Sequence, residues 1–155
     1  MEKIESFRVD HTRLLPGLYV SRRDGGDEKP VTTFDIRITQ PNMEPVMDMP
    51  AIHTMEHLGA TFLRNSALKD EIIYFGPMGC RTGFYLITRD VPNEKVLEVT
   101  IDVLKKIIAH EGEVFGATRK ECGNYLDLDL ADAKRECEKY LAVLEGKEND
   151  FIYKG

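Results

Sequence analysis

Two histidines and a glutamate form the most informative group in this sequence. His53 and His57 are four residues apart, and Glu56 directly precedes the second histidine, in the pattern H-x-x-E-H. On a helix, residues i and i+4 lie one above the other, so both imidazoles can bind one metal ion without backbone strain. Glu56 would lie at the edge of this face, where a carboxylate can transfer protons without being a ligand. With 4 His in the 155-residue chain, shuffled sequences would contain the pattern about 0.01 times each, so we interpret it as a signal.

A catalytic metal site usually has three protein ligands and an open position, so two histidines do not complete one. The candidates for the third ligand are Cys122, Cys80, His11 and His110. Cys122 precedes a glycine and a predicted helix, and the N-terminus of a helix favours the thiolate that a metal needs. The simpler alternative is a helix that carries two surface histidines and binds no metal.

The other two cysteines differ in their surroundings. Cys80 ends a Gly-Pro-Met-Gly segment, where glycines let a side chain come close to a ligand, and the charge of Arg81 would favour its thiolate. Beside a metal, this thiolate and the Glu56 carboxylate would form an acid/base pair suited to moving protons on carbon. An ordinary loop cysteine is the alternative. Cys137 lies in a helical apolar stripe, which predicts a buried small hydrophobic residue.

The elements that would position these residues follow from the periodicity. Apolar residues at positions 34, 36 and 38 alternate with polar ones, which predicts a half-buried strand with Arg37 on its solvated face. This strand would form a hairpin with an earlier one across the turn at 24–27. Asp48 and Asn93 are expected to cap the first two helices. We expect strands near 18–20, 34–38, 72–75 and 84–88, and helices over 50–65, 93–108 and 126–144.

Composition and charge restrict the class of protein. The 155 residues suffice for one domain over 1–155. The predicted strands do not alternate regularly with helices, which favours an α+β fold with an antiparallel sheet packed against helices over a doubly wound parallel sheet. The net charge of −6 disfavours nucleic acid as a partner, and no apolar run reaches the roughly 18 residues that span a membrane. Three cysteines form no disulfide framework, and no apolar leader is visible, so we expect a cytoplasmic protein.

Three longer motifs carry a resemblance to a known family. They are H-T-M-E-H at 53–57, G-P-M-G-C-R-T-G at 76–83 and E-C-G-N-Y at 121–125. Five shorter segments agree in the same order: S-F at 6–7, D-H at 10–11, P-G at 16–17, F-D-I-R at 34–37 and Q-P-N at 40–42. Together they resemble the S-ribosylhomocysteine lyases of the LuxS family over nearly the whole chain. One mild departure is Gly76, where a serine or a similar residue is expected.

The resemblance implies a site made of three groups of residues. The metal ligands would be His53, His57 and Cys122. The general acid/base pair would be Glu56 and Cys80. The residues that contact the substrate would be Ser6, His11 and Arg37, although His11 is ambiguous from its residue type alone.

The resemblance also implies a cofactor, an assembly and a reaction. Each subunit of a homodimer would hold one divalent metal, Fe²⁺ in the native enzyme with Zn²⁺ or Co²⁺ as alternatives, in an active site at the subunit interface. The substrate would be S-ribosylhomocysteine, cleaved to homocysteine and 4,5-dihydroxy-2,3-pentanedione, the precursor of autoinducer-2. The carbonyl would migrate along the ribose until β-elimination expels homocysteine. Such an enzyme would serve the methyl cycle and quorum sensing.

Two other functions use the same histidines. The H-x-x-E-H pattern also occurs in inverzincin metallopeptidases, in which Glu121 could be the third ligand. This chain is short for a protease, however, and a peptidase would leave Cys80 and Cys122 without a role. The second alternative is a non-enzymatic metal protein, in which both thiols and both histidines close the site and leave no open position.

Overall fold

One antiparallel sheet organises the chain, and the computed structural model describes residues 1–154 of it. Its strands are β1 (Gly17–Asp24), β2 (Val31–Arg37), β3 (Ile72–Pro77) and β4 (Gly83–Arg89), in the spatial order β1-β2-β4-β3. The predicted hairpin is confirmed, because β1 pairs with β2 in an antiparallel arrangement. The other two predicted strands, β3 and β4, also pair antiparallel. The central pair β2–β4 matches Arg37 with Gly83, so the turn between β3 and β4 lies at the end of β2.

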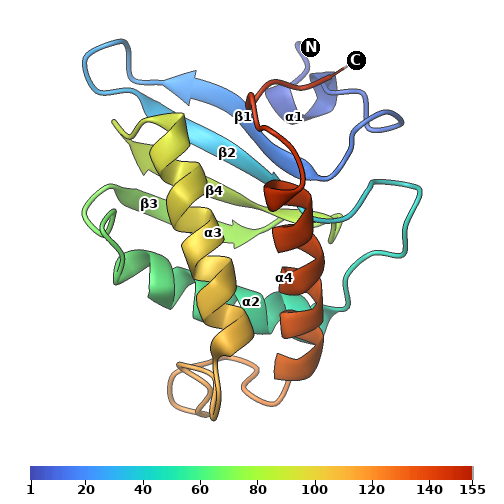
Figure 1. Ribbon diagram of the computed structural model, residues 1–155, viewed down its shortest axis with the longest axis vertical. Coiled ribbons are helices and arrows are strands. Elements are labelled where there is room, and N and C mark those ends of the chain that lie inside the picture. Colours follow the sequence, from blue (N-terminus) through green and yellow to red (C-terminus); the bar gives the residue numbers. More distant parts are fainter. Residues whose placement is uncertain (155) are drawn as a thin grey trace.

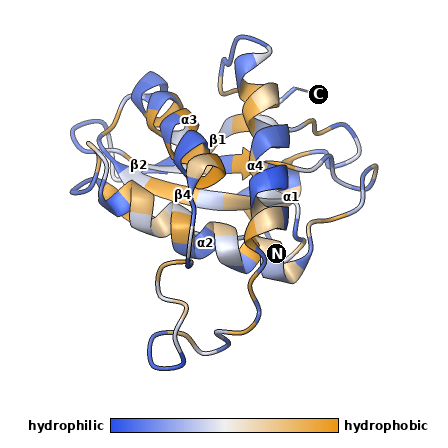
Figure 2. Cartoon of the chain, turned by 60° about the horizontal axis from the view of Figure 1, so that its bottom comes forward, coloured by the Kyte–Doolittle hydropathy of each residue, from blue (hydrophilic) through white to orange (hydrophobic). Residues whose placement is uncertain are grey.

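Three long helices cover one face of this sheet (Figure 1). They are α2 (Met49–Arg64), α3 (Asn93–Ala109) and α4 (Leu130–Glu145), while the short α1 (Glu5–Arg8) lies near both chain ends. In Figure 2, α3 and α4 show alternating hydrophilic and hydrophobic bands, as expected for helices with one buried face. The core between the layers includes Phe34, Phe84 and Leu58, each with no exposed surface. The α+β prediction is therefore confirmed.

Some predicted helix ends differ from the structure. The third long helix begins at Leu130 rather than 126, because Asp129 caps it by accepting a hydrogen bond from the Asp132 amide. Pro92 rather than Asn93 is the N-cap of α3, and Asn93 is its first residue. Asp48 is the N-cap of α2, as predicted, but its side chain makes no capping hydrogen bond. Of the helices within residues 1–154, none is long and apolar enough to cross a membrane.

The other face of the sheet is partly covered by the two ends of the chain. Strand β2 is buried on both faces from Phe34 to Arg37, which the alternation did not predict. The C-terminal tail passes across β1, where the amide of Val20 donates a hydrogen bond to the Phe151 carbonyl at 2.9 Å. The tail therefore shields polar side chains of β2 that would otherwise contact solvent.

Candidate active site

Helix α2 positions the H-x-x-E-H residues. Its buried side carries Ile52, Met55 and Leu58, each at most 3% exposed. The 3.6-residue period leaves His53, Glu56 and His57 half-buried at the edge of the helix. The two imidazole rings are 4.6 Å apart between centroids and nearly perpendicular. The predicted helix thus places both histidines on one face, with the carboxylate beside them.

The long loop between α3 and α4, residues 110–129, brings a cysteine to this face. Cys122 Sγ lies 3.3 Å from His53 Nε2, and ligand atoms of His53, His57 and Cys122 all lie within 4.8 Å of one another. The loop is fixed to α2 where the amide of Asp129 donates a hydrogen bond to Thr54 Oγ1 at 2.8 Å. Since α4 begins only at Leu130, the helix N-terminus expected beside Cys122 is not there. The sulfur instead accepts a hydrogen bond from the Asn124 amide at 3.4 Å.

Backbone carbonyls of the same loop orient both imidazoles. His53 Nδ1 is 2.8 Å from the Asp127 carbonyl, and His57 Nδ1 is 2.8 Å from the Phe115 carbonyl. A carbonyl oxygen only accepts, so each Nδ1 is the donor, and in the neutral imidazole the lone pair that can bind a metal is then on Nε2. Such hydrogen bonds are the usual means of fixing a metal-binding histidine.

The donor set fits a divalent metal ion. Bond lengths of about 2.0–2.1 Å to imidazole nitrogen and 2.3 Å to thiolate sulfur put tetrahedral ligands roughly 3.5 Å apart. The observed 3.3 Å between Cys122 Sγ and His53 Nε2 agrees with that spacing. Two imidazoles and one thiolate suit iron, cobalt or zinc, and three ligands leave a position for substrate.

Cys80 lies in the turn between β3 and β4 and is exposed. The turn is joined to the segment that leads into α2, because the Met47 amide donates a hydrogen bond to the Arg81 carbonyl at 3.1 Å. Cys80 Sγ lies 3.1 Å from Thr82 Oγ1 and 3.9 Å from Arg37 Nη1. The structure thus brings Cys80 together with Arg37, near the end of α2 that carries His53.

Arg37 does not face solvent, and that prediction was wrong. Its side chain is 4% exposed, and it forms a two-pronged ion pair with Asp35, which is 1% exposed. Burial alone would lower the pKa of Arg37, but the charge and hydrogen bonds of Asp35 outweigh it and raise this pKa, so the guanidinium stays charged. Residue type alone did not single out Asp35 as the partner of Arg37, although it stands inside the F-D-I-R segment.

Ser6 and His11 both belong to the N-terminal segment that precedes β1. Ser6 lines a hollow on the open face of the sheet together with Tyr74 and Tyr85. His11 Nδ1 is 2.9 Å from the carbonyl of Val9. Within residues 1–154, no hydrogen bond joins either residue to the metal-ligand group or to Cys80.

The other candidate ligands lie in different surroundings. His110 Nε2 is 2.7 Å from the Glu113 carbonyl, and Glu121 is exposed and accepts a hydrogen bond from the Thr118 hydroxyl at 2.6 Å. Cys137 has no exposed surface, and burial raises the pKa of its thiol to about 12. The prediction of a buried small hydrophobic residue at 137 is confirmed.

Comparison with known proteins agrees with this geometry. The family model described as S-ribosylhomocysteinase (LuxS) matches residues 4–150. This chain belongs to the LuxS family. An S-ribosylhomocysteine lyase of Finegoldia magna is 51% identical over 155 residues, 99% of each chain. Those of Clostridium acetobutylicum and Phocaeicola vulgatus are each 49% identical, over 97% and 99% of this chain and 96% and 97% of theirs.

Gly76, the departure noted within the LuxS motifs, lies in strand β3 rather than in the turn. A Cβ atom at this position would come within 1.9 Å of the Tyr74 hydroxyl. The glycine therefore accommodates the tyrosine two residues earlier, whose ring lies across it. This pair affects the open face of the sheet, and no metal-ligand candidate takes part in it.

Proposed function

We propose that residues 1–155 act as one metal-dependent S-ribosylhomocysteine lyase domain. The main support is the convergence of His53, His57 and Cys122, with Nδ1 of each imidazole held by a carbonyl and Nε2 left as the nitrogen that would bind a metal. A divalent ion held there supplies Lewis-acid polarisation of a sugar carbonyl, which makes the neighbouring C–H bonds acidic. The names of the relatives support the substrate, S-ribosylhomocysteine.

The remaining chemistry belongs to two side chains. Glu56 adjoins the proposed ligands on α2, and the exposed Cys80 lies in the turn that is hydrogen-bonded to Met47, two residues before α2 begins. We assign both side chains to proton transfer. Moving protons between adjacent sugar carbons shifts the carbonyl along the ribose. Once the carbonyl is β to the sulfur-bearing carbon, the carbon between them loses a proton and the C–S bond breaks. The sulfur leaves as the thiolate of homocysteine, which takes up a proton, and the remaining enol tautomerises to 4,5-dihydroxy-2,3-pentanedione. Arg37, next to Cys80, would bind the substrate.

A homodimer would complete the site. Ser6 and His11, proposed to contact substrate, make no hydrogen bond to the proposed ligands within residues 1–154, which favours their contribution to the active site of a second copy. Ile4 and Phe7, near Ser6 in sequence, are 58% and 69% exposed, and Tyr74 of β3 is 48% exposed. Apolar surface of this kind favours association.

The metal and the biological role are part of the same proposal. Imidazole and thiolate ligands suit Fe²⁺, which we propose as the native ion, and also Zn²⁺ or Co²⁺. The dihydroxypentanedione product would provide the autoinducer-2 precursor for quorum sensing, and homocysteine would return to the methyl cycle in the cytoplasm.

The direct test is release of a thiol. Metal-loaded, reduced protein with excess S-ribosylhomocysteine should release homocysteine, measured with a thiol reagent. Cys80→Ala should keep its metal and lose turnover, whereas Cys122→Ala should lose metal affinity. If the wild-type protein releases no thiol, the lyase proposal is wrong. A Cys122→Ser variant that keeps metal and cleaves peptides would support the peptidase, and loss of metal from Cys80→Ala would support a closed structural site.

A further inference from the structure

The buried ion pair beside Cys80 is joined to the end of the chain. Tyr153 donates a hydrogen bond from its hydroxyl to Asp35 Oδ2 at 2.7 Å, across 118 residues of sequence. The same oxygen accepts from Arg37 Nη2 at 2.7 Å, while Oδ1 accepts from Arg37 Nε at 3.1 Å. Burial and the charge of Asp35 raise the pKa of Tyr153, so its phenol stays protonated and donates.

Arg37 continues this series of hydrogen bonds to the thiol. Its third nitrogen, Nη1, donates to Thr82 Oγ1 at 2.8 Å and lies 3.9 Å from Cys80 Sγ. Thr82 Oγ1 is itself 3.1 Å from the sulfur. With Nε and Nη2 both held by Asp35, the guanidinium has one orientation, and that orientation directs Nη1 to the Cys80 turn.

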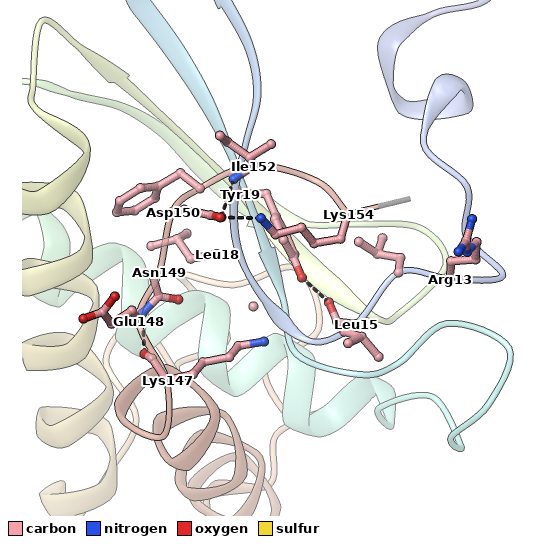
Figure 3. Close-up of a pocket in the computed structure, with 13 residues that line it drawn as sticks. Arg13, Leu15, Leu18, Tyr19, Lys147, Glu148, Asn149, Asp150, Ile152 and Lys154 are labelled. Carbon is pink, nitrogen blue, oxygen red and sulfur yellow. Dashed lines mark hydrogen bonds and ion pairs between the residues drawn. The ribbon is translucent and has the colours of Figure 1, made fainter.

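The tail that carries Tyr153 is firmly attached to β1. Asp150, Ile152 and Lys154 pass across this strand next to Tyr19 (Figure 3). The rings of Tyr19 and Tyr153 stack with centroids 4.9 Å apart. Phe151 adopts a left-handed backbone conformation with φ of 63° and is 6% exposed. The tail therefore has a defined position, and the phenol reaches Asp35 from a fixed support.

We propose that Tyr153 is a positioning residue for Cys80, acting through Asp35 and Arg37. This role extends the lyase function proposed above, in which Cys80 transfers protons. Removing a charged pair from water is costly, and in some proteins such a pair fixes a specific arrangement of the groups around it. Here that arrangement is the orientation of the guanidinium relative to a reactive sulfur.

The phenol affects the electrostatic potential at the thiol as well as the geometry. A hydroxyl that donates to Asp35 draws part of the carboxylate charge toward itself, so the carboxylate compensates less of the charge on Arg37. Without that donor, the carboxylate offsets more of the guanidinium charge, and one buried lone pair is left without a partner. Cys80 would then be in a less positive environment, next to an arginine that is less well fixed.

The test compares the rates at which two alkylating reagents of different charge react with Cys80. Iodoacetate is an anion and iodoacetamide is neutral. A positive potential at Cys80 attracts the anion, so the rate constant for iodoacetate divided by that for iodoacetamide reports this potential. Peptide mass spectrometry separates Cys80 from Cys122 and the buried Cys137. We expect Tyr153→Phe, which keeps the stacked ring and removes only the hydroxyl, to lower this ratio about three-fold, a part of what a hydrogen bond to a charged group contributes. Turnover should fall through kcat.

Tyr19→Phe is the matched control, because its hydroxyl donates to the Leu15 carbonyl at 2.8 Å, away from Asp35. It keeps the ring stack and should leave the ratio unchanged. Tyr153→Ala should lower the ratio at least as much as Tyr153→Phe. If Tyr153→Phe leaves the ratio unchanged, whether or not Tyr153→Ala alters it, the tail acts only by packing and the proposal is wrong. Alkylation needs no substrate, so a protein without lyase activity that still shows the fall would refute the lyase function alone.

Discussion

The stability of this fold should depend strongly on one buried carboxylate, and Asp35→Asn tests this. The carboxylate of Asp35 accepts three hydrogen bonds, two from Arg37 and one from Tyr153. An asparagine has one acceptor oxygen and one NH₂ group in their place. Whichever way the amide is turned, its NH₂ group faces an N–H of Arg37, and the guanidinium remains buried without an opposite charge.

The size of the effect follows from burial. Breaking a buried ion pair by removing one partner costs about 3–5 kcal/mol, and Arg37 and Asp35 are 4% and 1% exposed. For a domain of this size, about 1 kcal/mol shifts the melting temperature by roughly 2–4 °C. We therefore expect Asp35→Asn to lower the melting temperature by roughly 6–20 °C.

The chain contains a matched control. Arg22 and Asp24 form an ion pair of the same sequence spacing on the neighbouring strand, at 2.8 Å, but their side chains are 57% and 50% exposed. Asp24→Asn should cost less than about 1 kcal/mol, because an exposed pair is screened by water. Thermal unfolding followed by circular dichroism, at one protein concentration, measures both variants. Equal losses in the two variants, or a shift below about 3 °C for Asp35→Asn, would refute the reasoning.

Three further predictions concern a positive-φ glycine, a buried thiol and a close backbone contact. Gly116→Ala should weaken metal binding about ten-fold, because φ of Gly116 is +69° and the new Cβ would lie 3.3 Å from His57 Nδ1. Competition with a chelator measures the dissociation constant of the metal, and an unchanged constant would contradict this prediction. The pKa of Cys137 is raised from 9.0 to about 12 by burial. Between these pH values this thiol ionises only in the unfolded chain, so the free energy of unfolding falls as the pH rises. The stability of wild type relative to Cys137→Ala should therefore decline over that range in urea unfolding. Gly83→Ala should lower the melting temperature strongly, since its Cβ would be 2.2 Å from the Ile36 carbonyl oxygen.

The elements of this fold were largely predictable because their signals are local. Alternation over positions 34–38 and helical spacing over 50–65 depend on neighbours in sequence. Both elements form, although β2 begins three residues earlier, at Val31, and ends at Arg37. The start of α4 was predicted too early, because residues 126–129 belong to the loop and Asp129, not an earlier residue, provides the cap. Apolar spacing alone does not distinguish the end of a loop from the first turn of a helix.

Arg37 shows where residue patterns fail. Alternation correctly separates it from the face of Phe34 and Ile36, but it cannot indicate what lies over the opposite face. There the cover includes the C-terminal tail, whose Tyr153 reaches Asp35 across 118 positions. A contact at that separation leaves no periodic signal in either segment, so an arginine in a half-buried strand was predicted to be solvated when it is enclosed.

The candidate metal site shows a second limit of residue patterns, because backbone groups leave no signal in the sequence. His53, His57 and Cys122 can be recognised in the sequence as candidate ligands, because only a few types of side chain bind metals. The groups that fix the two imidazoles are the carbonyls of Phe115 and Asp127, and any residue type carries a carbonyl. Loop 110–129 thus contributes one proposed ligand and two orienting acceptors, of which residue type reveals only the ligand. Changes in the path of this loop should therefore affect metal affinity even where His53, His57 and Cys122 are all retained.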